Sequence, residues 1–480
     1  MKTIFEKSIK GRKGVDPGTP LKSAENILPA GLRRAEDPKL PELSELDVIR
    51  HFTGLSRLNF SVDTEFYPLG SCTMKYNPKV NEAASMLTGF SALHPYTAYI
   101  NEGAAQGALE VVHNISNLLA GITGMKSVTT QPYAGAHGEL TGVLLMAAYH
   151  RAKGNKKKYM VVPESAHGTN PASAAVGGYS IISVPVNAEG EMDFDAFKKK
   201  MNDEVAGVMM TVPSTLGVFE RRAKEICEIA RKHDAIMYYD GANLNAILGK
   251  ARPGDLGFDI VHINLHKTFS TPHGGGGPGA GAVGVSARVA EFLPVPTVKK
   301  SKTGRFEMDF GVKKSIGPVA SFFGNFGVLL KAYTYILMLG KEGLIEAAEM
   351  AVLNANYIMA KLKPYYDVAL DRLCMHECVF TAKRQAKNGV HAIDIAKGLI
   401  DRRFHPPTVY FPLVVEEAIM IEPTETESKE TMDSFIQAMI EIAKIAETNP
   451  EELKNAPVTM PIFRPDETKA ARELKLTCGL

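Results

Sequence analysis

The sequence has few cysteines, little net charge and no uninterrupted apolar segment long enough to span a membrane. Five cysteines among 480 residues are too few and too scattered for a disulfide framework, and their odd number is typical of a reducing compartment. Cys374 and Cys378 lie four residues apart without a second cysteine pair, so we expect no metal site there or elsewhere. Cysteine usage therefore predicts a cytoplasmic protein that binds no metal.

The charge pattern excludes two further classes of partner. The formal net charge is +2, which gives no strong field for nucleic acid or an anionic membrane. The N-terminal sequence MKTIFEKSIKGRKGVDPG carries charge but no apolar segment, so we expect no secretory signal. The longest apolar stretch, residues 322–340, is interrupted by Asn325 and Lys331 and predicts a buried helix rather than a membrane span.

Short apolar runs alternate with helical patterns between about residues 125 and 290. Amphipathic helices are expected at 139–152, 193–201 and 221–233. Such alternation predicts an α/β fold with a largely parallel sheet covered on both faces, and ligands that bind at the carboxyl ends of its strands. The expected strands are residues 126–130, 158–163, 180–186, 206–212, 235–240, 259–265 and 281–286.

Composition divides the chain into three predicted parts. Residues 1–75 are rich in proline and charge and predict an N-terminal arm, residues 76–330 a large domain, and residues 331–480 a smaller α+β domain. Within the small domain we expect a helix near 391–401, a strand-like segment at 408–423 and a final helix at 428–446.

Asp240 and Lys267 carry the clearest chemical signal. Asp240 closes the apolar strand AIMYYD, and Lys267 follows the apolar strand DIVHINL 27 residues after Asp240. Burial at a strand end lowers the pKa of a lysine, so that it can form a Schiff base, and a buried aspartate can pair with the ring nitrogen of pyridoxal 5'-phosphate (PLP). Alone, the lysine could be solvated and the aspartate could cap a helix. Together they predict a PLP site.

Three further segments are expected at the same edge of the sheet. In TTQPYAGAHGE (129–139) the backbone N–H groups of Gly135 and Ala136 open a helix and could bind a phosphate. In ESAHGTNPASA (164–174) the ring of His167 could lie on the cofactor ring, although a structural histidine is the other interpretation. Ala242 leaves room for the cofactor ring, and we place His266, the neighbour of Lys267, among the cofactor-binding residues.

At this level of detail the sequence resembles the glycine cleavage system P-protein family, glycine dehydrogenase (decarboxylating). The similarity is carried by long motifs that follow the order of the family and extend from about residue 67 to residue 428. These motifs are LGSCTMKYNP, QPYAGAHGE, SAHGTNPASA, DGANLNAILGKARPGDLGFDIVHINLHKTFSTPHGGGGPG, RRFHPPTVYFP and MIEPTETESK. Some members are one chain of about twice this length and others are two subunits, and this chain is similar to subunit 2, the C-terminal half that binds PLP.

The resemblance implies a fold and a set of roles. The fold would be fold type I of PLP-dependent transferases (aspartate aminotransferase-like), with a mostly parallel sheet in the large domain. Lys267 would hold PLP as a Schiff base, Asp240 would pair with the ring nitrogen, and His167 would stack on the ring. Gly135 and Ala136 would lie at the phosphate, although Tyr133-Ala134 stands here where the family often has serine, which leaves a side-chain phosphate contact from position 134 open.

The resemblance also implies a reaction and partners. Glycine would be decarboxylated, and the aminomethyl group would be transferred to the lipoyl arm of the H-protein. The expected assembly is an α2β2 heterotetramer with P-protein subunit 1. Two alternatives remain open: another fold type I enzyme, such as an aminotransferase with Arg252 or Arg305 as the carboxylate ligand, or a non-catalytic partner subunit. The presence of both Lys267 and Asp240 argues against the second alternative.

Overall fold

The computed structural model describes residues 2–15, 18, 27–36 and 38–474, so Cys478 lies outside the described residues. The chain forms two compact units, and each is described here by itself. The first unit comprises Met1–Thr64 with Pro461–Leu480. Its elements are η2 (Ala30–Leu32), α1 (Glu45–Ser56) and α17 (Glu467–Arg472).

The second unit, Glu65–Met460, holds the remaining elements. The expected arm, residues 1–75, extends past the boundary between the two units, and the expected limit at residues 330 and 331 lies inside the long helix α12 (Phe326–Leu362). The three predicted domains therefore stay a prediction. Helix α12 contains most of the segment in which we expected a buried helix, and its backbone leaves the helical conformation at Gly340.

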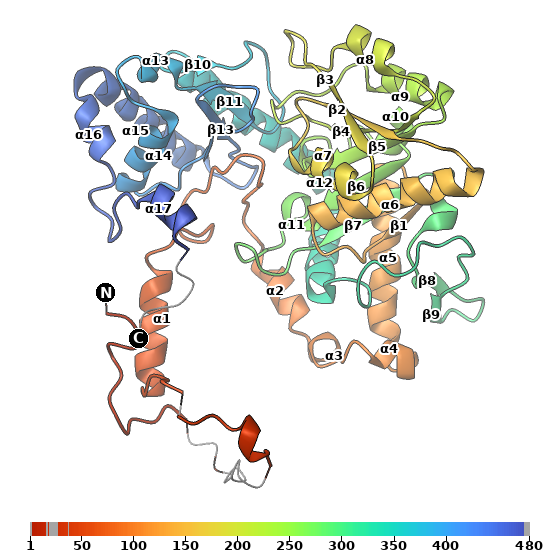
Figure 1. Ribbon diagram of the computed structural model, residues 1–480, viewed down its shortest axis with the longest axis horizontal. Helices are drawn as coiled ribbons and strands as arrows, with labels where there is room; N and C mark the ends of the chain where they lie inside the picture. The colour runs from red at the N-terminus through yellow and green to blue at the C-terminus, as the bar shows by residue number, and fades with distance from the viewer. Residues whose placement is uncertain (1, 16–17, 19–26, 37, 475–480) are drawn as a thin grey trace. The chain divides into compact units, whose positions relative to one another are not determined.

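A seven-stranded sheet forms the centre of this unit, and each expected strand is present (Figure 1). Its order is β1-β7-β6-β5-β4-β2-β3. Five neighbouring strands, β3 to β6 in space, are parallel, whereas β7 runs antiparallel to both of its neighbours. The strands are β1 (Ser127–Thr129), β2 (Tyr159–Pro163), β3 (Ser180–Val184), β4 (Val205–Thr211), β5 (Ile236–Gly241), β6 (Ile260–Asn264) and β7 (Gly281–Val285).

Helices cover both faces of this sheet, as the sequence predicted. Successive side chains of a strand point to opposite faces. Ile236 and Tyr238 of β5 accordingly pack in one core cluster with α6 and α7, while Met237 and Tyr239 pack in another with α5, α8, α9 and α12. The helices around the sheet are α2 (Lys79–Ser85), α3 (Thr88–Ser91), α4 (Thr97–Ile100), α5 (Gln106–Thr123), α6 (Gly135–Lys153), α7 (Thr169–Val176), α8 (Phe194–Lys200), α9 (Ala223–Lys232), η3 (Leu244–Ala246), α10 (Pro253–Leu256), α11 (Leu265–Thr268) and η4 (Ala290–Phe292).

Two smaller sheets complete the unit. Strands β8 (Thr297–Lys300) and β9 (Phe306–Asp309) form a hairpin. A four-stranded antiparallel sheet has the order β10-β11-β13-β12 and packs on the last helices. Its strands are β10 (Asp367–Val368), β11 (Cys378–Thr381), β12 (Thr408–Val409) and β13 (Ala418–Ile421), and the helices are α13 (Lys383–Ala386), α14 (Ala392–Asp401), α15 (Lys429–Thr448) and α16 (Pro450–Asn455).

The prediction of one strand-like segment at 408–423 is wrong. The segment forms two short strands, β12 and β13, that pair antiparallel with Val409 opposite Ile419. The chain between them turns through Phe411-Pro412, and proline lacks the N–H group that a continuous ladder requires. Among the described residues, every helix is too short or too polar to cross a membrane.

Candidate active site

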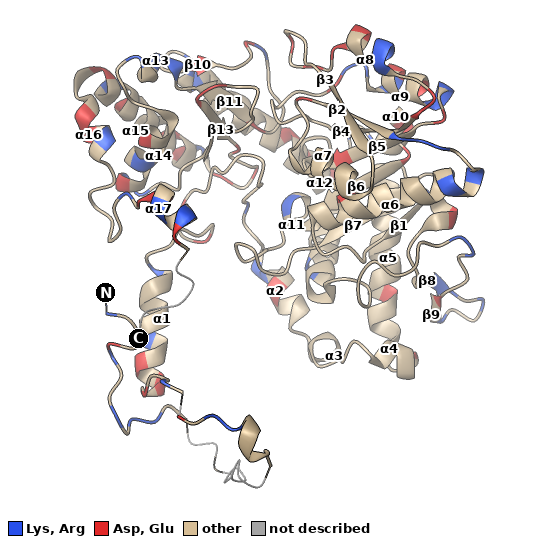
Figure 2. Ribbon diagram, viewed as in Figure 1, with Lys and Arg blue, Asp and Glu red and all other residues tan. Residues whose placement is uncertain are grey.

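The side chains expected at the site lie at one edge of the large sheet. Asp240 is near the end of β5, His167 follows β2, and Lys267 lies in α11, the short helical turn that follows β6. Among the strands that the structure describes in the large sheet, Asp240 is the only Asp, Glu, Lys or Arg (Figure 2). Because parallel strands end at the same edge, the fold brings these three residues together. The charge of Lys267 accordingly acts on the pKa of His167.

Asp240 is held in place by several donors. Its Oδ2 accepts hydrogen bonds from Asn170 Nδ2 (2.8 Å) and Thr211 Oγ1 (3.3 Å), and its Oδ1 accepts one from the backbone N–H of Ala242 (3.0 Å). Only 1% of Asp240 is exposed. Burial opposes ionisation, but the interaction with His262 and these hydrogen bonds outweigh it and hold the pKa of Asp240 below its usual value. The carboxylate is therefore a fixed negative charge.

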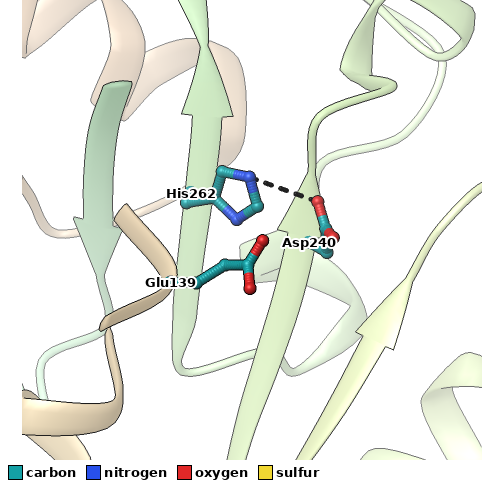
Figure 3. Close-up of side chains that lie close together, drawn as sticks. All are labelled: Glu139, Asp240 and His262. Atoms are coloured by element: carbon teal, nitrogen blue, oxygen red, sulfur yellow. Dashed lines mark ion pairs between the residues drawn. The ribbon is translucent and has the colours of Figure 1, made fainter. Parts of the chain in front are cut away.

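Two further side chains surround Asp240 (Figure 3). His262 Nε2 lies 3.2 Å from Asp240 Oδ1, and His262 Nδ1 lies 2.6 Å from the hydroxyl of Tyr238. Burial lowers the pKa of His262, so the ring is neutral and, with its proton on Nε2, faces Asp240 as a dipole. Glu139 of α6 is the third member, and burial together with the charge of Asp240 raises its pKa to about 7.

Lys267 is 8% exposed, and its amine points toward the segment before α2. Nζ donates a hydrogen bond to the backbone carbonyl of Ser71 at 2.6 Å. The strand that we expected at 259–265 ends at Asn264, because Leu265 already begins the helical turn. This turn points the lysine away from the strand direction and toward the loop LGSCTMKYNP.

His167 is half-buried and held at its backbone and its ring. Its N–H donates to Thr211 Oγ1 (3.0 Å), and its Nδ1 lies 2.8 Å from the hydroxyl of Thr169. Thr169 in turn donates to Glu139 at 2.5 Å. Burial lowers the pKa of His167, so its ring is neutral at pH 7. The ring therefore offers an aromatic face beside Asp240. Pro171 is the third residue of α7.

The start of α6 is suited to an anion. Gly135 is its first residue and Ala136 its second, so their N–H groups have no partner within the helix. A Cβ on Gly135 would meet Asn264 Oδ1 at 2.7 Å, so only glycine allows α6 to begin this close to β6. The buried hydroxyls of Thr268, at the end of α11, and of Thr271, three residues later, have no hydrogen-bond partner. Helix N–H groups and free hydroxyls are the donors that a phosphate requires.

The remaining expected residues border the same region. Ala242 is buried and binds Asp240 through its backbone. His266 lies with Nδ1 3.2 Å from the carbonyl of Ala280, and burial lowers its pKa to about 4. The two arginines considered for a substrate carboxylate are elsewhere in the fold. Arg252, the residue before α10, pairs with Asp255 of α10, and Arg305 lies in the turn between β8 and β9.

Several residues at the site were missed from the sequence. Glu139 and His262 lie within motifs that we quoted, but we assigned neither a role. The alternation of side chains along neighbouring strands could have revealed His262. Asp240 of β5 and His262 of β6 are register partners and face the same helix, α6. Glu377 and Glu422 contact the loop near Lys267. They lie at the ends of β11 and β13 in the four-stranded sheet, which we call the small-domain sheet, and could not be placed beside Lys267 without the fold.

Comparison with known proteins identifies the family. The family model described as glycine cleavage system P-protein matches residues 21–305, and that described as glycine dehydrogenase, C-terminal domain, matches residues 347–460. The probable glycine dehydrogenase (decarboxylating) subunit 2 of Caldanaerobacter subterraneus subsp. tengcongensis is 56% identical, over 98% of this chain and 97% of the relative. The protein of the same name from Bacillus velezensis is 54% identical, over 98% and 96%.

Solved structures show the same fold. The chain is similar to a crystal structure of glycine decarboxylase (P-protein) of the glycine cleavage system in inhibitor-bound form, with a TM-score of 0.73 and 21% identity over 88% of this chain and 95% of the other. It is also similar to the cysteine desulfurase of Thermococcus onnurineus, with a TM-score of 0.60 and 16% identity over 80% and 95%. The expected fold class, α/β of fold type I, is confirmed.

Proposed function

The chain belongs to the glycine cleavage system P-protein family, as a glycine dehydrogenase (decarboxylating) subunit 2, and we propose that Lys267, Asp240 and His167 carry its PLP-dependent decarboxylation of glycine. The observation that carries this proposal is the ionised Asp240, buried at the sheet edge where Lys267 and the start of α6 also lie. When bound, PLP withdraws electrons from the α-carbon of glycine, so that its carboxylate can leave as carbon dioxide.

Each residue has a distinct role in this proposal. Asp240 holds a negative charge against the ring nitrogen and keeps a proton on that nitrogen. Lys267 would hold the cofactor through Nζ as a Schiff base, and its amine would move protons during the reaction. His167 covers one face of the ring. The N–H groups of Gly135 and Ala136 bind the phosphate.

The surroundings of these residues support the roles. Asn170, Thr211 and Ala242 already donate to the Asp240 carboxylate, so its orientation is fixed before a ligand arrives. Such preorganisation is the usual source of electrostatic stabilisation in enzymes. His266 contributes to the cofactor site through its ring, which burial keeps neutral.

We also propose the partners and location of the protein. The substrate is glycine, the acceptor is the lipoyl arm of the H-protein, and the second subunit is P-protein subunit 1 in an α2β2 heterotetramer. In support, the relatives are themselves named as a subunit 2. Free thiols at Cys72, Cys227, Cys374 and Cys378 support a cytoplasmic location.

Covalent attachment tests the role of Lys267. We expect the purified chain with PLP to be yellow, and borohydride reduction to label the peptide that contains Lys267. Lys267→Ala should abolish this adduct, because it removes the amine that forms the Schiff base. Peptide mapping by mass spectrometry measures the label. Lys250→Ala, which changes an exposed lysine paired with Glu349, serves as the control and should label normally. A retained adduct in Lys267→Ala would refute the assignment.

Two substitutions separate the shape of His167 from its hydrogen bonding. Replacement by Phe keeps an aromatic face and should cost about tenfold in kcat, whereas replacement by Ala loses the face and should cost about 100-fold, the usual effect of a misplaced reactant. Steady-state decarboxylation kinetics measure both. Equal losses would show that the contact of Nδ1 with Thr169, and not stacking, is what the reaction needs.

A further inference from the structure

A strained backbone segment lies against Lys267. Ser71 and Thr73 have φ values of 64° and 27°, in a region that residues other than glycine rarely adopt. We call residues 71–73 the Ser71–Thr73 segment. The carbonyl of Ser71 accepts the hydrogen bond from Lys267 Nζ at 2.6 Å. Strain of this kind persists only where the surroundings hold the backbone, and it is concentrated at functional sites.

Two buried carboxyl groups hold this segment. Glu377 Oε2 accepts a hydrogen bond from the N–H of Ser71 (2.8 Å). Glu422 accepts from the N–H of Thr73 at Oε2 (3.1 Å) and from its hydroxyl at Oε1 (2.5 Å). Both glutamates are fully buried. The two carboxyl groups therefore hold the segment through the backbone N–H groups of Ser71 and Thr73 and through the hydroxyl of Thr73.

The small-domain sheet places the two carboxyls side by side. Glu377 directly precedes β11 and Glu422 directly follows β13. Cys378 is the register partner of Ile421 in this antiparallel pair, so Glu377 and Glu422 are the next pair outward. His376 Nε2 lies 3.8 Å from Glu377 and 4.0 Å from Glu422. We call the two carboxyls the Glu377–Glu422 pair.

The Glu377–Glu422 pair does not hold two full charges at neutral pH. Burial and the neighbouring Glu422 raise the pKa of Glu377 well above its usual value, and burial raises the pKa of Glu422 to about 7. The charge of Lys267 favours ionisation of both. Burial lowers the pKa of His376 to about 3, so this ring adds no positive charge. At neutral pH the two carboxyls therefore hold at least one proton between them and carry no more than one negative charge.

Other titratable groups also face Lys267. Burial, with a smaller contribution from the charge of Lys267, lowers the pKa of the surrounding histidines, which are therefore neutral: His167, His262, His266 and His273. Burial raises the pKa of the Cys72 thiol, so it is neutral as well. The Asp240 carboxylate already accepts hydrogen bonds from Asn170 and from the N–H of Ala242. The Glu377–Glu422 pair is thus a negative charge that interacts with Lys267.

We propose that the Glu377–Glu422 pair positions the Ser71–Thr73 segment over Lys267 and supplies a negative charge that favours the protonated form of the Lys267 nitrogen. The inference rests on the proposed attachment of the cofactor at Lys267. Glu377 and Glu422 are positioning residues, because they act through the backbone of the segment and through their charge. Their effect is on how readily the lysine nitrogen holds its proton when it is attached and when it is released.

The test is the pH dependence of the cofactor's absorbance in the full chain, reconstituted with PLP and subunit 1. The absorbance reports whether the attached nitrogen is protonated. Removing a negative charge disfavours the protonated form, so the pH midpoint must fall. The double variant Glu377→Gln with Glu422→Gln should lower it by about one pH unit or more, the usual effect of one nearby charge. Each single variant should lower it less, because the remaining carboxyl then ionises more readily.

Glutamine at position 422 can keep the contacts of a protonated glutamate. Its amide oxygen can accept from the N–H of Thr73, and its amide nitrogen can donate to the hydroxyl oxygen of Thr73. Asn245 Nδ2 lies 3.4 Å from Glu422 Oε1, and Asn245 Oδ1 has no partner, so the Asn245 amide can reverse to receive the new donor. Because the chromophore itself requires a folded site, each titration also verifies that the variant has folded.

A second variant and a control complete the design. Thr73→Val keeps the shape of the side chain but removes a donor that lowers the pKa of Glu422, so the midpoint should again fall. Glu220→Gln is the control, because it replaces another buried carboxyl that accepts from backbone N–H groups, those of Met192 and Arg222. This variant should leave the midpoint unchanged. An unchanged midpoint in Thr73→Val and in the double variant would overturn the inference.

This result is distinct from a failure of the proposed function. If borohydride labels Lys267 in the wild type while the midpoints do not move, Lys267 binds the cofactor and only the inference is wrong. If Lys267 is never labelled, the proposed function itself is wrong.

Discussion

Replacement of Asp240 by Asn should leave PLP bound and reduce kcat for glycine decarboxylation by a factor of about 100 to 1,000 or more. The amide has nearly the same shape. Its oxygen, in the place of Oδ1, can still accept from the N–H of Ala242, and its nitrogen, in the place of Oδ2, can donate to the hydroxyl oxygen of Thr211. A neutral amide cannot hold a proton on the ring nitrogen, and electrons released from glycine then have no acceptor of sufficient strength. Glycine-dependent release of carbon dioxide, measured beside PLP content, tests this expectation.

A matched control comes from the opposite edge of the same sheet. Asp259 directly precedes β6, is equally buried, accepts from the N–H of Met237 (3.1 Å) and pairs with Arg288 at 2.9 Å. Asp259→Asn should lower the thermal midpoint, because it weakens a buried ion pair, yet leave kcat within about twofold. A kcat for Asp240→Asn close to that of the wild type would show that another group balances the ring nitrogen.

The second large effect concerns partners. We expect the chain alone to bind PLP weakly and to decarboxylate glycine at least about 100-fold more slowly than a mixture with subunit 1, because an incompletely formed site misplaces the reactants. In support, the region from α2 to α4 exposes the apolar side chains of Met86, Leu87, Tyr96 and Ile100, a surface that is typical of a contact with another protein.

Activity of the mixture should also require lipoylated H-protein. The aminomethyl group that remains after loss of carbon dioxide needs an acceptor, and the lipoyl disulfide accepts it in the proposed reaction. Carbon dioxide release is measured with each component omitted in turn, and unlipoylated H-protein is the control. Full turnover by this chain alone with H-protein would overturn the requirement for a second subunit while leaving the roles of Lys267 and Asp240 unaffected.

The sequence predicted the large sheet better than the small one. Apolar runs such as AIMYYD and DIVHINL have a single interpretation once helices alternate with them, and all seven strands were found. The reversed direction of β7 was not predicted, because a five-residue strand has the same pattern in either direction. In the small sheet, strands of two residues, such as β10 and β12, leave no periodicity to detect.

The candidate site was predicted where single residues close strands, and it was incomplete where distant segments meet. Asp240 and Lys267 could be proposed because Asp240 ends one apolar run and Lys267 follows another. The contact of Glu422 with Thr73 joins residues 349 positions apart, and its existence depends on how the small-domain sheet packs against the loop before α2. No local pattern encodes such a contact, since a buried glutamate after an apolar strand reads as a surface charge.

Because side chains alternate between the two faces along β5, the number of residues before Asp240 in this strand decides to which face the carboxylate points. Tyr238 and Asp240 face α6, whereas Met237 and Tyr239 face the opposite core. Loss of a single residue between Ile236 and Tyr239 would rotate the aspartate through half a turn and bury its charge among aliphatic side chains, although every strand could still form. The protein would keep its architecture and lose the carboxylate that we propose keeps a proton on the ring nitrogen. We therefore expect insertions and deletions in this strand to abolish activity even where the fold survives.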